Sequence, residues 1–272
     1  MDCCKHEIKI FLVEFYVSDI IFEMKRVIVK IGTRVLSKED GTLDLNFLEH
    51  IVEQIVELRK MGIQVVLVTS GAVGAGKSLI SLPEVKSDVV RKQAFAAVGQ
   101  VKLMNTYSEF FAKHNYYCAQ VLATKEDFRD ETHYLNMKNC FEGLLLDNVI
   151  PVVNENDVVA IAELLFTDND ELAGLVAKQL EVDAVIILTG TDGILDEKNK
   201  TVPEVNTSNI DEVASLISIN KSASGRGGMV SKFSVAKELS QKGITVHIVV
   251  GKRKNILVDV VRGEKVGTRF VS

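Results

Sequence analysis

The sequence contains no long run of basic residues, and its formal net charge at pH 7 is -5. A nucleic-acid partner is therefore not expected, because contact with a phosphate backbone requires clustered Lys and Arg. Cysteine is scarce, and the 4 cysteines form no Cys-x-x-Cys pair; the 5 histidines are scattered. These absences argue against a disulfide framework and a zinc site, and we expect a reduced, cytoplasmic protein.

The chain also lacks an uninterrupted apolar stretch long enough to span a bilayer. Residues 8–22 are apolar, but three charged residues interrupt them, and no small-residue cleavage site follows. We therefore expect no membrane association. Met24 directly precedes the first clear strand. We interpret residues 1–23 as an appended segment, not native if translation starts at Met24, and residues 24–272 as one domain.

Linkers rich in proline or serine, low-complexity tracts and internal repeats are absent as well, which favours a single domain. With 272 residues, 47% of them hydrophobic, the chain is long enough for one large α/β domain. Apolar runs alternate with segments of helical periodicity, which predicts a mainly parallel sheet covered on both faces. We expect strands at 27–31, 63–68, 116–122, 149–153, 184–188, 244–250 and 266–271, and helices at 44–61, 88–114 (one or two), 132–146, 171–180, 209–219 and 229–242.

Two clusters of amides and carboxylates flank one predicted strand and helix. Asn154-Glu-Asn-Asp157 follows a strand, and Asp168-Asn-Asp170 opens a helix. Open α/β sheets bind ligands at such positions. Their acceptors suit the ammonium of a zwitterion, and amide donors suit its carboxylate. The alternative is a pair of polar turns and a helix N-cap, but the joint placement of both clusters favours a ligand site.

Lys30 ends the first apolar strand, and Gly32 and Thr33 follow it. A lysine in an apolar run is costly unless its ammonium reaches an anion or water. Backbone N–H groups at such a turn suit a phosphate. We therefore favour a phosphate contact over the alternative, a lysine that extends to solvent along the sheet edge.

Residues 71–78, GAVGAGKS, match the P-loop pattern between a predicted strand and a helix. A P-loop would place Lys77 on phosphates and Ser78 on magnesium. In the alternative, only Ser70-Gly71-Ala72 binds an anion at a helix N-terminus, and the later glycines allow close packing. A P-loop enzyme also needs a strand that ends directly in a magnesium-binding Asp, and no predicted strand supplies one. We favour the alternative.

A third glycine-rich segment, GRGGMVSK at 225–232, precedes a predicted helix. Its glycines would let the backbone approach phosphate oxygens, and Lys232 follows about one helical turn later. The alternative is a flexible surface loop, because glycine-rich loops are common.

Taken in order, KIGT at 30–33, VTSGA at 68–72, NEND at 154–157, DND at 168–170 and GGMVSK at 227–232 resemble the amino acid kinase family. The resemblance covers residues 25–271. It implies an αβα sandwich with a mainly parallel central sheet, and with ATP and the acceptor across the carboxyl ends of the strands. The pair NEND and DND is its specific part. That pair implies ATP- and Mg²⁺-dependent phosphorylation of the γ-carboxylate of L-glutamate to glutamyl 5-phosphate, the first step of proline biosynthesis.

The resemblance also implies roles for individual residues. Those implied to hold glutamate are Ser70, Gly71, Ala72, Asn154, Asp157 and Asn169. Those implied to hold ATP are Lys30, Gly32, Thr33, Thr189, Gly190, Gly227, Gly228, Met229 and Lys232. Lys30 and Lys232 would stabilise the transfer, and Asp170 would orient them. No protein ligand to a metal is assigned.

Two positions depart from the family pattern. Gly190 stands where the family often has Asp, and Arg226 stands where it often has Thr. Both changes concern nucleotide contacts. The C-terminal RNA-binding-like domain of many members is also missing from this sequence, which affects any regulation that depends on it.

The resemblance further implies a homo-oligomer, either dimer or tetramer, and functional coupling to glutamyl phosphate reductase. Two alternatives stay open at this point. One is another kinase of the same fold that acts on acetylglutamate, aspartate or a phosphorylated acceptor. The other is a nucleotide-binding regulatory protein without catalysis, although Lys30, Asp170 and Lys232 together argue against it.

A chain that starts at Met24 is expected to fold and to retain full activity, because no predicted strand or motif uses residues 1–23. Thermal unfolding and steady-state rates of the shortened and full-length chains check this. An insoluble or inactive shortened chain would show that the N-terminal segment packs on the domain or completes an oligomer.

Overall fold

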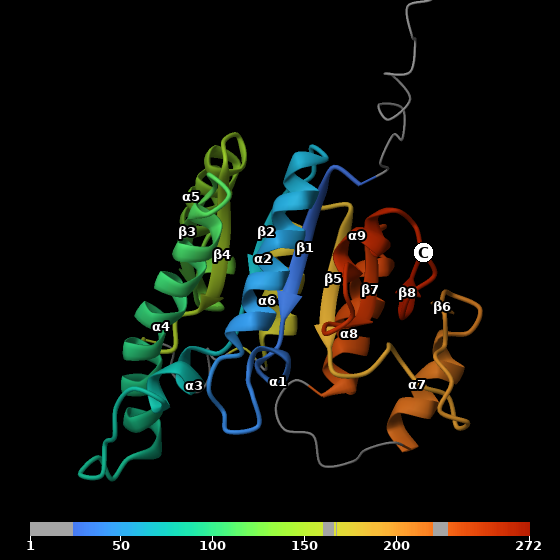
Figure 1. Cartoon of the computed structure of the whole chain (residues 1–272). Coiled ribbons are helices and arrows are strands. Elements are labelled where there is room, and N and C mark those ends of the chain that lie inside the picture. Colours follow the sequence, from blue (N-terminus) through green and yellow to red (C-terminus); the bar gives the residue numbers. More distant parts are fainter. Residues whose placement is uncertain (1–23, 160–165, 167, 220–227) are drawn as a thin grey trace, which may run out of the picture.

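The fold is seen in a computed structural model that describes residues 24–159, 166, 168–219 and 228–272. The described residues form one sheet of eight strands in the order β3-β4-β2-β1-β5-β7-β8-β6 (Figure 1). All neighbouring strands are parallel except β7 and β8, which are antiparallel. The strands are β1 Arg26–Ile31, β2 Gln64–Val68, β3 Tyr117–Ala123, β4 Val149–Glu155, β5 Ala184–Thr189, β6 Glu204–Val205, β7 Thr245–Val250 and β8 Thr268–Phe270.

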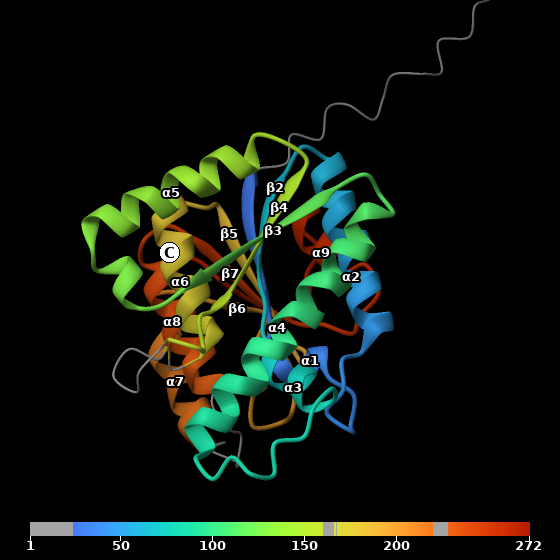
Figure 2. The ribbon, with the colours of Figure 1, turned by 90° about the vertical axis from the view of Figure 1, so that its left-hand side faces the viewer.

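Helices cover both faces of this sheet, as the predicted αβα sandwich requires. One face carries α2 Leu45–Lys60, α3 Ala72–Lys77, α4 Asp88–Ala112 and α9 Ile256–Val261. The other face carries α5 Glu131–Leu145, α6 Asn169–Leu180, α7 Ile210–Ile219 and α8 Met229–Ser240. Figure 2 shows the two helical layers on either side of the sheet. The short α1, Thr33–Leu36, follows β1 directly.

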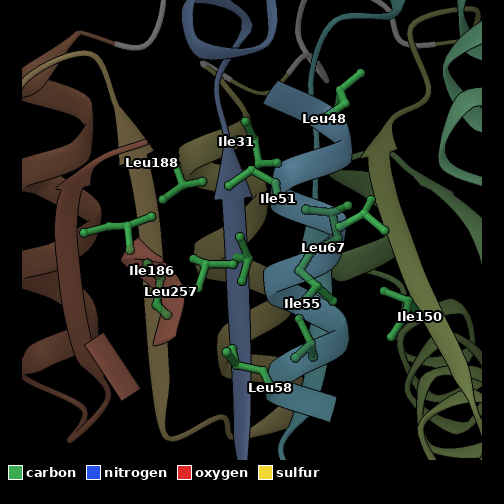
Figure 3. Close-up of a cluster of buried hydrophobic side chains, with 14 of the residues drawn as sticks. Ile31, Leu48, Ile51, Ile55, Leu58, Leu67, Ile150, Ile186, Leu188 and Leu257 are labelled. Atoms are coloured by element: carbon green, nitrogen blue, oxygen red, sulfur yellow. The ribbon is translucent and has the colours of Figure 1, made fainter. Parts of the chain in front are cut away.

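The centre of the core lies between β1 and α2. Five of the six β1 residues are buried, as expected for a parallel strand covered on both faces. Asp44 caps α2 by accepting a hydrogen bond from the Phe47 N–H at 3.2 Å. The apolar stripe of α2 then packs on the sheet, with Ile51 and Ile55 toward β1 (Figure 3). This packing fixes where the carboxyl end of β1 projects.

The structure confirms the predicted strand and helix order with small changes of boundary. Residues 88–112 form one helix, and β4 extends two residues past the predicted strand to Glu155. The sequence analysis missed β6 and α9, because two residues, or six mostly apolar residues, carry no readable periodicity. Residues 220–227, which include Arg226 and the start of the glycine-rich segment 225–232, lie outside the described residues, as do residues 1–23.

Two glycines hold α3 directly against α4. A Cβ on Gly76 would lie 1.9 Å from the Phe95 carbonyl oxygen, and a Cβ on Gly99 would lie 1.7 Å from the Ala72 carbonyl oxygen. The interpretation of the later glycines as packing residues is therefore confirmed for Gly76. This contact fixes the N-terminus of α3 relative to α4.

None of the helices in the described part of the chain is long and apolar enough to cross a membrane.

The Gly99→Ala change is expected to destabilise the protein by about 1–3 kcal/mol, because the added methyl must push α3 away from α4. Thermal unfolding should show Tm lower by several degrees. Gly143→Ala is the matched control. Gly143 lies in α5 with nothing within 4 Å of its added Cβ, and alanine there should raise stability slightly. Equal Tm values for the two variants would contradict the close contact.

Candidate functional site

The polar residues of the site lie at the carboxyl ends of adjacent parallel strands. Lys30 lies near the end of β1, Thr69 and Ser70 follow β2, and Asn154 lies near the end of β4. The N-terminus of α6 comes to the same edge, since Asn169 contacts residues from β2 and β4. Parallel strands place their carboxyl ends at one edge of a sheet, which is where such sheets bind ligands.

One carboxylate pairs with two lysines from different elements. Asp170, in the first turn of α6, is fully buried. Its Oδ2 lies 3.0 Å from Lys232 Nζ, and its Oδ1 pairs with Lys30 Nζ. Both lysines are also buried. The cluster therefore holds two ammonium groups against one carboxylate, away from water.

Burial dominates the electrostatics of Lys30. Removal of its ammonium from water lowers the pKa of Lys30 below 10.5, and the nearby Lys232 lowers it further. Asp170, and to a lesser extent Asp168, act in the opposite direction. The net effect is a lowered pKa of Lys30. Burial of the charged Lys30 therefore lowers the free energy of unfolding. Such a site favours the approach of an anion.

Asp168 caps α6 and lies beside this cluster. Its Oδ1 accepts from the N–H groups of Asp170 at 2.8 Å and Glu171 at 3.2 Å. Its Oδ2 is buried and has no hydrogen-bond partner among the described residues. The first turn of α6 thus combines a cap, a free carboxylate oxygen and the carboxylate that pairs with the lysines. The sequence analysis placed Asp168 in the polar cluster that opens this helix and named a helix N-cap as the alternative there, but it did not assign Asp168 to a ligand.

The amides of the two predicted clusters meet in one network. Asn169 Nδ2 lies 2.9 Å from Ser70 Oγ and 2.9 Å from Asn154 Oδ1, and it also contacts the Thr69 carbonyl oxygen. Asn154 Nδ2 donates to Gln100 Oε1 of α4 at 2.9 Å. Ser70, Asn154 and Asn169 are therefore brought together, as the sequence analysis expected of one ligand site.

Asp157 lies apart from that network. Its Oδ1 is 2.7 Å from Lys92 Nζ, on the first turns of α4. Asp157 and Gln100 both line a cavity of about 240 Å³, with Ala72 on its wall. Lys92 and Gln100 were missed by the sequence analysis. The available signal for Gln100 was a polar residue on the apolar face of the helix predicted at 88–114.

The turn at 70–72 and the helix after it decide between the two interpretations of GAVGAGKS. Gly71 has φ of 100° and caps α3, and residues 72–77 are helical. The Ala75 N–H bonds to Gly71, and the Ser78 N–H bonds to Gly74, so these groups are used within the helix. Lys77 is exposed at the end of α3. The P-loop interpretation is wrong.

The residues expected to hold ATP lie around β1, β5 and α8. Gly32 caps α1 and Thr33 is its first residue. Thr189 ends β5, and nothing lies within 4 Å of a Cβ added to the exposed Gly190. Gly228 caps α8 and Met229 begins it, one turn before Lys232, whereas Gly227 lies outside the described residues.

Solved structures with this architecture define the class of the fold. A carbamate kinase from Giardia aligns with TM-score 0.65 and 21% identity, covering 92% of this chain and 99% of that structure. A UMP kinase from Bacillus anthracis aligns with TM-score 0.61 and 16% identity, covering 91% and 96%. Residues 25–250 match the model of the amino acid kinase family. The chain belongs to the amino acid kinase family.

Within that family, several curated proteins named glutamate 5-kinase are similar to this chain. The protein from Chlorobaculum tepidum is 47% identical over 91% of this chain and 69% of its own length. The protein from Bacteroides thetaiotaomicron is 45% identical over 92% and 71%. The protein from Alkaliphilus metalliredigens is 37% identical over 93% of this chain and 98% of its own length.

The Lys30→Met variant is expected to be at least as stable as the wild type at pH 7. Because burial lowers the pKa of Lys30, the unfolded chain binds this proton more tightly, and unfolding free energy rises with pH from the lowered pKa toward 10.5. Asp170 keeps Lys232 as its partner in the variant. Urea unfolding across alkaline pH measures both effects, and the rise should be weaker without Lys30.

Lys265→Met serves as the control for this experiment, because Lys265 is exposed. Its substitution should change unfolding free energy by less than about 0.5 kcal/mol. A loss of stability well beyond that in Lys30→Met would contradict the idea that burial of Lys30 is only partly compensated.

Proposed function

We propose that this protein is a glutamate 5-kinase, which transfers the γ-phosphoryl group of ATP to the γ-carboxylate of L-glutamate. The product is glutamyl 5-phosphate, and the reaction is the first step of proline biosynthesis. The observation that carries the proposal is the buried pair of lysines on Asp170, next to the amides of Asn154 and Asn169. The glutamate 5-kinases at 37–47% identity support the same substrate.

The chemistry requires positioning rather than a general base. A glutamate side-chain carboxylate has a pKa of about 4.3, so it is already an anion at neutral pH. One of its oxygens attacks the γ-phosphorus, and the bond to the bridging oxygen of ADP breaks. The barrier falls when the reactants are held in line and the charge on the transferring oxygens is neutralised. Lys30 and Lys232 supply that charge, and Asp170 fixes both ammonium groups.

The amino acid is proposed to bind through the residues predicted from the sequence. Ser70, Gly71 and Ala72 offer donors at the N-terminus of α3, and Asn154 and Asn169 offer amides. Asp157 suits the substrate ammonium. Lys92 Nζ lies 2.7 Å from Asp157 Oδ1, so an ammonium group fits beside this carboxylate. Substrate binding then replaces or shares the Lys92 contact.

ATP is proposed to bind across β1, β5 and the start of α8, through Gly32, Thr33, Thr189, Gly190, Gly227, Gly228 and Met229. Gly190, in place of the Asp that the family often has, leaves open space beside the end of β5. A Mg²⁺ ion bound to the phosphates would neutralise their charge, and it takes oxygen ligands from phosphates and one or two carboxylates. The unpartnered Asp168 Oδ2 fits such a ligand set. The described residues contain no preformed cluster for a metal.

The cellular setting is proposed on chemical grounds. An acyl phosphate reacts readily with water, so an enzyme that consumes it at once is expected, and a glutamyl phosphate reductase fits that role. The composition favours a cytoplasmic enzyme. A homo-oligomer, dimer or tetramer, remains part of the proposal from the family resemblance.

A coupled assay of ADP release tests the function directly. Glutamate, acetylglutamate, aspartate and uridylate are offered in turn with ATP and Mg²⁺. Glutamate should give at least about a hundredfold higher kcat/KM than each of the others, because a site built to bond polar substrate groups discriminates strongly. Preference for another acceptor would replace glutamate as the proposed substrate.

Lysine variants separate the catalytic groups from a surface lysine. Lys30→Ala and Lys232→Ala should each lower kcat at least about a hundredfold, with a smaller change in KM for ATP, because their charges matter most in the transition state. Lys77→Ala should stay within about threefold of wild type, because Lys77 is exposed on α3. An inactive Lys77 variant beside a near-normal Lys30 variant would contradict the assigned ATP site.

A further inference from the structure

Gln100 is a buried amide on the face of α4 that packs on the sheet. Only 8% of the residue is exposed. Its Oε1 accepts from Asn154 Nδ2 at 2.9 Å, and its Nε2 has no hydrogen-bond partner among the described residues. An unpaired buried donor costs free energy. The hydrogen bond that offsets this cost is the one that Gln100 Oε1 accepts from Asn154.

The orientation of both amides follows from a backbone group. The Glu155 N–H donates to Asn154 Oδ1 at 2.9 Å, and a backbone N–H can only donate. Asn154 must therefore turn its oxygen toward Glu155 and its Nδ2 toward Gln100, which must present Oε1. This chain of donors and acceptors leaves no freedom to exchange oxygen and nitrogen in either amide.

The same orientation sets the position of Asn169. Because Asn154 Oδ1 faces the site, it also accepts from Asn169 Nδ2 at 2.9 Å. Without the Gln100 acceptor, Asn154 Nδ2 would be buried and unpaired, and only the Glu155 N–H would still orient the amide. A tilt of Asn154 that relieves this cost would weaken the bond from Asn169 Nδ2. Asn169 directly precedes Asp170, so a change in its contacts occurs one residue away from the carboxylate that pairs with both lysines.

We propose that Gln100 is a positioning residue for the glutamate site, which acts through Asn154 to hold the Asn169 amide in its binding orientation. This inference rests on the proposed function for the identity of the substrate. Gln100 is 3 residues before Leu103 and 7 before Tyr107 on the buried stripe of α4, so the helix that packs on this face of the sheet also sets the polar network.

The test uses two variants of Gln100 and one control. Gln100→Met keeps the length of the side chain and removes the acceptor. Gln100→Glu keeps an acceptor oxygen for Asn154 in either protonation state, replaces the unpartnered Nε2 with a second oxygen, and adds a negative charge when ionised. Gln54→Met is the control. Gln54 is also buried, and its Oε1 accepts from the Leu257 N–H at 2.9 Å, between α2 and α9.

Gln100→Met is expected to raise KM for glutamate at least about tenfold, with KM for ATP and kcat within about threefold. Gln100→Glu and Gln54→Met should keep KM for glutamate within about threefold. The proposal is overturned by a glutamate KM in Gln100→Glu as high as in Gln100→Met, by a normal KM in Gln100→Met, or by equal losses for ATP. If Gln100→Met does not fold, the Gln100→Glu result decides, since a tenfold rise there overturns the proposal.

A second measurement separates this inference from the proposed function. If the wild type does not turn over glutamate, the proposed function fails, and the positioning claim is tested by unfolding alone. The effects of Gln100→Met and Asn169→Ala on the urea midpoint should then be non-additive in the double variant, because both act on Asn154. Additive midpoints would overturn the coupling.

Discussion

The structure depends on one buried carboxylate that holds two buried ammonium groups. Asp170 stands between Lys30 and Lys232, and the three residues come from α6, β1 and α8. Two lysines away from water would repel each other, and burial already lowers the pKa of Lys30. The Asp170 carboxylate pairs with both ammonium groups and partly offsets their repulsion, and the three groups together keep a net positive charge. That surplus charge is what a transferring phosphoryl group needs, and a well-packed apolar core would not supply it.

The rest of the fold brings these three groups to one edge. The parallel order of β4, β2, β1 and β5 places the carboxyl ends of the strands side by side, and α6 begins at the same edge. The close contact of α3 and α4 at Gly76 and Gly99 then fixes the helices behind the amide network. Fold and site are coupled, because α4 packs on the sheet and supplies Gln100 to the network.

Local pattern was enough to predict every strand except the two-residue β6, most helices and the segments of the site. Lys30 and Asn154 could be selected because each is a polar residue at the end of an apolar strand, and Asp170 because it belongs to a polar cluster that opens the next helix. The partners of Gln100 and Lys92 could not be predicted, because Asn154 and Asp157 meet α4 only through the tertiary fold, although Gln100 is visible as a polar residue on an apolar helix face. The sequence 71–78 matches a P-loop, yet its glycines form a helix, and a pattern of residue types does not distinguish these backbones. The short α9 lacked a detectable period.

The Asp170→Asn variant tests the central claim most directly, because it keeps the shape of the side chain and removes only its charge. The measurement is kcat at saturating ATP and glutamate, with circular dichroism to confirm the fold. We predict a fall of at least about a hundredfold, since neither ammonium would keep its position without the carboxylate. A folded Asp170→Asn protein with kcat within tenfold of wild type would contradict the account.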